Sequence, residues 1–193
     1  QLRATNAGEA LKLLGYYENM RGGKLEITGR FDDAVADRPL AGVVSVKDYR
    51  VVEAPVLAHV LSIMALTGIL EALQGDGLAF NSLKIPFVQR HGAISLTDAR
   101  ASGVSLGFTA TGTIYTHADV LDIKGTVVPA YAINSALGHI PVLGDIFTGG
   151  KKGSGIFAAN LTMTGPREEP KVLVNPLSAL TPGILRNVFS IFG

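Results

Sequence analysis

A stretch of about fifty residues, Leu78–Val128, alternates between apolar and polar side chains and shows no helical spacing. Its clearest part is Val104–Tyr115, where two sets of side chains occupy opposite sides of an extended chain. One side carries Val104, Leu106, Phe108, Ala110 and Ile114, and the other carries Ser105, Thr109, Thr111 and Thr113. Turns are expected at residues 90–92, 102–103 and 116–119, where a glycine or an aspartate interrupts the pattern. The stretch therefore predicts an antiparallel meander with one apolar and one polar face.

Helical and strand patterns flank this stretch on both sides. Before it we expect a helix at 6–20, begun by Asn6 with Glu9 at capping-box spacing and stopped at Gly22-Gly23. Strands at 24–31 and 40–53 follow, and then an apolar helix that Pro55 opens and that runs to about Leu73, before the stop at 75–77. After it we expect a bent helical segment at 129–150, strands at 154–165 and 170–174, and a terminal helix at 177–192.

These elements predict the fold class. We expect a mainly β protein with α: an antiparallel twisted sheet or groove with interspersed amphipathic helices packed on it. It would form a single domain over residues 1–193, with helix–strand units at about 6–53, 55–128 and 130–175 and the terminal helix at 177–192. The sequence suggests an internal repeat, because the same order of features occurs around Gly68 and again around Gly144. In each case a glycine breaks a helix, and a short helix, a Gly-rich stop and a strand follow. Chance similarity between apolar helices is the alternative.

The composition excludes some classes of function. The net charge is +1 and no basic stripe is present, so nucleic acid is not an expected partner. Charged residues make up 17%, below the roughly 25% that is usual, and the mean hydropathy is +0.32. Such a balance requires either a deep core or an apolar surface for a ligand, a partner or a membrane. The absence of cysteine excludes disulfides and thiolate chemistry.

No targeting segment is visible in the sequence. No apolar run reaches the roughly 18 residues of a membrane-spanning helix. The first residues, Gln1-Leu2-Arg3, do not look like a natural start, so we expect a fragment or a processed product.

Motifs for catalysis occur only in unsuitable contexts. Gly103–Gly107 matches G-x-S-x-G, but Ser105 is expected on a strand with no helix after it. A dinucleotide-like pattern at 153–158 leads into a strand instead of a helix. The four histidines lack metal-ligand spacing, so we expect no catalytic residue, no metal and no cofactor. Lys151 and Lys152 follow Gly149-Gly150, either in a solvated turn or as contacts for a lipid headgroup.

A set of motifs gives a more specific indication. It comprises Ile140-Pro141-Val142-Leu143-Gly144, Thr148-Gly149-Gly150, Asn175-Pro176-Leu177-Ser178 and Pro182-Gly183-Ile184-Leu185-Arg186. With Ala54–Ala58 and Gly75–Gly77, this set resembles the C-terminal region of the AsmA-like superfamily, closest to its YhdP-type members, over nearly all of the chain. The resemblance implies a periplasmic part of an inner-membrane-anchored protein of Gram-negative bacteria, with a hydrophobic β-groove implicated in phospholipid transport to the outer membrane. The anchor and most of that groove are absent from this sequence.

Two functions from different classes follow. In the first, the chain is a non-enzymatic lipid-binding end of a bridge-like phospholipid transfer protein, and its apolar face is an open trough for acyl chains instead of a closed sandwich. The expected lining is Leu106, Phe108, Ile114, Leu121, Ile123, Phe157, Leu161 and Met163. In the second, the chain is a structural or docking module that contacts a membrane or an envelope protein. The helix from Val56 to Leu73 and the tail would then make the contact, with Ile184, Leu185, Val188, Phe189 and Phe192 as candidates in the tail.

Overall fold

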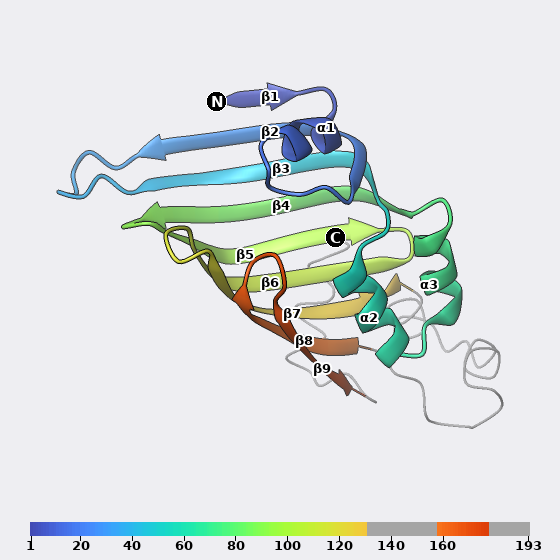
Figure 1. Ribbon diagram of the computed structural model, residues 1–193. Helices are drawn as coiled ribbons and strands as arrows, with labels where there is room; N and C mark the ends of the chain where they lie inside the picture. Colours follow the sequence, from blue (N-terminus) through green and yellow to red (C-terminus); the bar gives the residue numbers. More distant parts are fainter. Residues whose placement is uncertain (131–157, 178–193) are drawn as a thin grey trace, which may run out of the picture.

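The computed structural model describes residues 1–130 and 158–177. They form one nine-stranded antiparallel sheet in which every strand pairs with the next along the chain (Figure 1). The strands are β1 Leu2–Ala4, β2 Met20–Phe31, β3 Leu40–Val51, β4 Leu78–Arg90, β5 Ala93–Gly103, β6 Leu106–Tyr115, β7 Val120–Pro129, β8 Ala158–Pro166 and β9 Lys171–Leu177. The helices are α1 Ala7–Leu13, α2 Pro55–Ile63 and α3 Thr67–Gln74. The predicted mainly β fold, an antiparallel sheet with interspersed helices, is confirmed.

The sheet is open and twisted. Within the described residues β1 and β9 each pair on one side only, so they are its two edges. The strands near β9 run at a marked angle to those near β1 (Figure 1). All connections between successive strands β4 to β7 are short turns, as the alternation over Leu78–Val128 predicts.

The strand register gives the sheet one apolar and one polar face. Successive partners across the sheet are Leu25, Val46, Leu83, Ala101, Phe108, Val127 and Ala159. Residues directly opposite one another in neighbouring strands point to the same side. This side is called the apolar face. The polar face carries Lys124 and the threonines of β6, which alternate with apolar residues along their strands.

The helices cover one end of the apolar face. This covered end is where β2 begins and β3 ends (Figure 1). Helix α1 packs on β2 and β3, and α2 extends to β9. Leu61 and Leu73 from the helices and Leu106 from β6 are fully buried there. The ring of Phe80 stacks on Tyr49 at 5.2 Å between centroids and lies 5.7 Å from that of Phe108. These aromatic contacts across β3, β4 and β6 form the centre of the core.

Glycine permits the close contact between α1 and the sheet. A Cβ added at Gly8 would lie 2.3 Å from the carbonyl oxygen of Met20, so no larger residue fits without a shift. The predicted N-cap is confirmed, because the Asn6 side chain accepts a hydrogen bond from the backbone N–H of Glu9. The predicted end is wrong. The helix ends at Leu13 instead of Met20, and Gly22-Gly23 lie inside β2 instead of stopping a helix.

The prediction of a single helix from Pro55 to Leu73 is also wrong, because two helices, α2 and α3, occupy this stretch. Ala65 has φ 54°, which ends α2 and lets α3 start at Thr67. The N–H of Ala65 donates to Ser62 O and the N–H of Leu66 donates to Leu61 O, both at 3.0 Å. This is the Schellman arrangement, in which a residue after the last turn takes the left-handed conformation. The predicted start at Pro55 and the stop at Gly75–Gly77 agree with the structure, whereas Gly68 lies in the first turn of α3 and breaks nothing.

Two boundaries differ by a few residues. The turn between β5 and β6 contains Val104 and Ser105 instead of Ser102-Gly103, so Val104 is 71% exposed and not on the apolar face. Strand β9 continues to Leu177, where a helix was expected to begin. Of the bent segment expected at 129–150, Pro129 ends β7, and the part after Ala130 falls outside the described residues, as does the tail after Leu177.

Candidate functional site

The apolar face continues beyond the helices towards the other end of the sheet. Its residues there are Leu40, Phe87, Ile94, Leu96, Ile114, Leu121 and Met163, all half-buried, together with Phe31, which is 52% exposed. We call these eight residues the distal section. Helices α1, α2 and α3 lie at the covered end, and no other helix is found among residues 1–130 and 158–177 (Figure 1). The distal section is thus a broad apolar surface of an open sheet, without cover from these three helices.

The strand register brings most of the predicted lining residues together. Ile114 pairs with Leu121, and Ile123 pairs with Met163. Phe108 and Leu161 lie on the same face nearer the helices and pack against the core. Ile123 is 5% exposed and Leu106 only 1% exposed, so Leu106 is part of the packed core. Phe157 lies outside the described residues, as do Lys151, Lys152 and the tail residues Ile184, Leu185, Val188, Phe189 and Phe192.

Residues from β2 to β5 were missing from the predicted lining. Phe31, Leu40 and Phe87 reach the distal section because neighbouring strands align them with Ile94 and Leu96. The alternation in β2 and β3 is a sequence signal from which Phe31 and Leu40 could have been predicted. In β5 the signal is broken, because this strand carries an extra residue around Thr97-Asp98 opposite Pro86.

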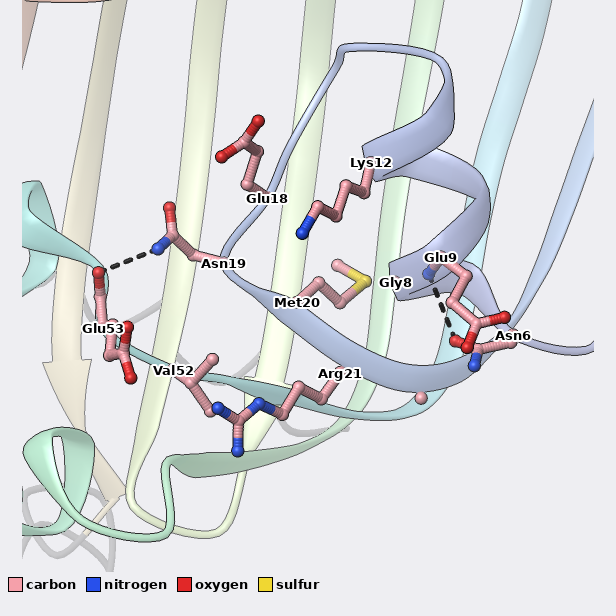
Figure 2. Close-up of a pocket in the computed structure, with 11 residues that line it drawn as sticks. Asn6, Gly8, Glu9, Lys12, Glu18, Asn19, Met20, Arg21, Val52 and Glu53 are labelled. Atoms are coloured by element: carbon pink, nitrogen blue, oxygen red, sulfur yellow. Dashed lines mark hydrogen bonds between the residues drawn. The ribbon is translucent and has the colours of Figure 1, made fainter.

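A separate cavity of about 530 Å³ lies beside the covered end (Figure 2). It is bordered by α1, by the start of β2 and by the link between β3 and α2. Its charged lining residues are Glu9, Lys12, Glu18, Arg21 and Glu53, and the buried side chains of Met20 and Val52 also border it. We call it the α1 cavity.

Asn19 fixes one wall of the α1 cavity. Its side-chain Nδ2 donates to the carbonyl oxygen of Glu53 at 2.8 Å (Figure 2). Its own backbone carbonyl oxygen accepts from the N–H of Val52 at 2.9 Å. Glu53 has φ 48°, a conformation that costs energy for a residue with a side chain. The two hydrogen bonds hold Glu53 in this conformation at the edge of the cavity.

The serine motif and the histidines, which the sequence places in contexts unsuitable for chemistry, lie apart from these surfaces. Ser105 lies in a turn that joins two strands, so the strand-to-helix turn of a nucleophile elbow is not formed. His59 is exposed on α2, and His91 and His117 lie in the turns after β4 and β6. Within the described residues, no three His, Cys, Asp or Glu side chains are grouped so as to hold a metal ion.

The same part of the chain contains no helix that is long and apolar enough to cross a membrane. Comparisons with protein-family models, with curated proteins and with solved structures find no match to this chain. The resemblance to AsmA-like proteins therefore rests on the sequence motifs alone, and the function has to be argued from the two faces of the sheet.

Proposed function

We propose that this chain is a non-enzymatic lipid-binding module whose distal section holds the acyl chains of phospholipids. The observation that supports this most strongly is an open sheet with an apolar face that α1, α2 and α3 cover at one end only. A monomeric soluble protein rarely exposes a large continuous apolar surface without a use for it. The distal section extends over β2 to β8, from Phe31 to Met163.

An acyl chain is a suitable occupant for such a surface. Each methylene that leaves water contributes about 0.8 kcal/mol, so a two-chain lipid needs no specific polar contact to bind. The eight members offer branched, aromatic and thioether side chains and no charged group, and one polar residue, Gln89, lies among them between Leu40 and Ile94. It can therefore accept acyl chains of different lengths without a defined register.

The resemblance to AsmA-like proteins supports the wider setting of this proposal. In that setting the module is a periplasmic part of an inner-membrane-anchored, bridge-like phospholipid transfer protein, and it receives or delivers lipid between inner and outer membranes. The AsmA-like motifs quoted above are the observation that favours this setting.

A docking module that uses α2 as its contact is less well supported. Val60 is 1% exposed and Leu61 is fully buried, so the apolar side of α2 packs inside this chain. Its exposed side carries Pro55, His59 and Ser62, with Ile63 at 40% exposure. The tail candidates, such as Phe189, lie outside the described residues.

A pair of substitutions in one strand tests the proposed function. Ile114 and Thr111 both belong to β6 but lie on opposite faces. Ile114→Glu places a charge on the distal section and should reduce uptake of a fluorescent phospholipid at least tenfold. Thr111→Glu, whose strand partner is Lys124, should leave uptake unchanged. Uptake is measured on the purified full chain, together with native mass spectrometry for lipid that copurifies. Equal uptake by both variants, or no lipid in either assay with the wild-type chain, would rule out the trough.

A further inference from the structure

Four large apolar or aromatic residues lie close together in sequence at the end of α1, and three of them project into solvent. Tyr17 is the least exposed, and burial raises the pKa of its hydroxyl to about 12. Leu13 is 88% exposed, Leu14 53%, Tyr16 65% and Tyr17 37%. We call these four residues the α1 tip. Six other large apolar residues are exposed in the described part of the chain, but they are scattered over the helix α2, the strands and one turn. The α1 tip is therefore the densest exposed apolar group in that part.

The backbone of the α1 tip is held in a fixed shape. The N–H of Gly15 donates to Lys12 O at 3.0 Å, and the N–H of Tyr16 donates to Leu11 O at 2.9 Å. With Gly15 at φ 69°, these bonds form a Schellman motif that closes the helix. The exposed side chains of Leu13 and Tyr16 are thus carried by an ordered, hydrogen-bonded turn.

Charges of both signs lie next to the α1 tip, in the α1 cavity. Lys12 and Arg21 are its cations, and Glu9, Glu18 and Glu53 are its anions (Figure 2). None of these five side chains forms an ion pair within residues 1–130 and 158–177, although ion pairs form elsewhere, for example between Arg3 and Glu26. The cavity thus presents separate positive and negative groups that remain available to a ligand carrying both charges.

We propose that the α1 tip docks onto the surface of a bilayer of zwitterionic phospholipid. Leu13, Leu14 and Tyr16 would enter the boundary between headgroups and acyl chains, where tyrosine is favoured. Lys12 and Arg21 bind the phosphates, and the carboxylates of the cavity bind the ammonium groups. A strongly anionic surface fits less well, because three carboxylates face it against two cations.

This docking surface is distinct from the distal section. Met20 borders the α1 cavity at the start of β2, whereas Phe31 ends the same twelve-residue strand at the distal section. At about 3.3 Å per residue the two lie more than 30 Å apart. The surface assigned here concerns contact with a membrane and does not require that the trough holds lipid.

Tryptophan substitutions test the docking directly, because the chain contains no tryptophan. Tyr16→Trp creates a single reporter in the α1 tip. Tyr115→Trp creates a control at the end of β6, on an exposed residue at the opposite end of the sheet. With vesicles of phosphatidylethanolamine and phosphatidylcholine, the emission of the Tyr16→Trp variant should shift to shorter wavelength and be quenched by brominated acyl chains. The Tyr115→Trp variant should show neither change.

A second pair of variants measures how much the contact depends on the α1 tip. Leu13→Glu should reduce cosedimentation with the same vesicles at least tenfold, while Leu173→Glu, at an exposed leucine on the polar face of β9, should not reduce it. Ile114→Glu should still bind vesicles, which separates docking from failure of the trough.

Four results would overturn the proposal. They are an unshifted Tyr16→Trp spectrum, equal vesicle binding by wild type and Leu13→Glu, binding only to vesicles of phosphatidylglycerol, and a spectral shift with free phosphoethanolamine but none with vesicles. The last result would indicate a site for a small soluble zwitterion instead of a membrane surface.

Discussion

Left-handed backbone at single residues determines where α1 and α2 end. Gly15 and Ala65 occupy the same position in two Schellman motifs, with φ values of 69° and 54°. Glycine adopts this conformation without steric cost, whereas alanine does not. At Ala65 the cost is offset by packing, because Leu61 is fully buried and Leu66 is 7% exposed, at the two positions that make contact in this motif.

The same substitution should therefore have opposite effects at two exposed alanines. Ala65→Gly removes the left-handed penalty and should raise the free energy of unfolding by about 0.5–1 kcal/mol. Ala72→Gly, in the interior of α3, should lower it by about 1 kcal/mol, because glycine is a poor helix former. Urea unfolding followed by circular dichroism measures both. Destabilisation by Ala65→Gly would contradict this account of the break between α2 and α3.

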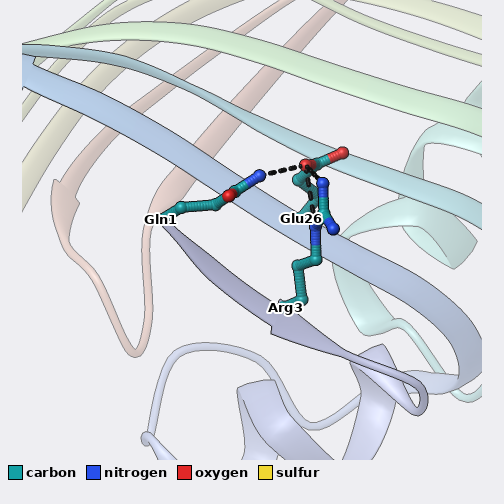
Figure 3. A network of polar contacts seen from close by, with 3 residues as sticks. All are labelled: Gln1, Arg3 and Glu26. Carbon is teal, nitrogen blue, oxygen red and sulfur yellow. Dashed lines mark hydrogen bonds and ion pairs between the residues drawn. The ribbon is translucent and has the colours of Figure 1, made fainter.

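At the scale of elements, the edge strand β1 depends on a small polar network. Strand β1 has only three residues, Leu2–Ala4, and pairs with β2. Glu26 accepts hydrogen bonds from Gln1 Nε2 at 2.6 Å and from Arg3 Nε and Nη2 at 3.0 and 2.8 Å (Figure 3). The hydrogen bonds from Arg3, then that from Gln1, hold the pKa of the Glu26 carboxyl below its ordinary 4.5.

Acid should release β1 before the rest of the sheet. Because the pKa of Glu26 is lower in the folded chain, its contribution is present above pH 4.5 and is lost as the pH falls through the folded value. We expect the amide protection of Leu2 and Ala4 to fall in this window. In the Glu26→Gln variant, the protection of these two amides should be lower than in the wild type at neutral pH. It should not fall further in the acid window, because the variant has no carboxyl group at this position. Amide hydrogen exchange read by NMR measures it, and identical pH profiles for the two proteins would refute the role of the network.

The sequence predicted some elements better than others for physical reasons. Alternation in β6 is unbroken from Leu106 to Ile114, so its faces could be assigned from local spacing alone. The break at Ala65 could not be predicted in this way, because alanine is the strongest helix former. The break is favoured by the packing of Leu66, which local spacing does not reveal. The faces of β5 were obscured by the extra residue near Thr97, which shifts the alternation of that strand by one.

At the scale of the whole molecule, the covered end and the distal section differ in packing. Leu61, Leu73 and Leu106 are fully buried at the covered end, whereas Leu40, Phe87 and Leu96 are only half-buried. Only part of the distal section could be predicted, because Ile114 and Leu121 are neighbours through one short turn. Phe31 joins them through four successive strand pairings, one of which pairs β3 with β4 across the helices α2 and α3. Regions with fewer buried contacts open at lower free energy. The distal section should thus be the less protected end of each long strand.

Bound lipid should raise the protection of the distal section more than that of the covered end. If acyl chains occupy the distal section, a phospholipid at about 100 times its dissociation constant stabilises the bound form by about 2.7 kcal/mol. Amide exchange should then slow by up to about 100-fold near Leu40, Ile94 and Ile114, and change little near Leu106. Hydrogen exchange with mass spectrometry on the full chain, with and without lysophospholipid below its micelle concentration, measures this. In Ile114→Glu the slowing should disappear. A larger effect at the covered end than at the distal section would place the lipid elsewhere, because a ligand protects most strongly the strands that it touches.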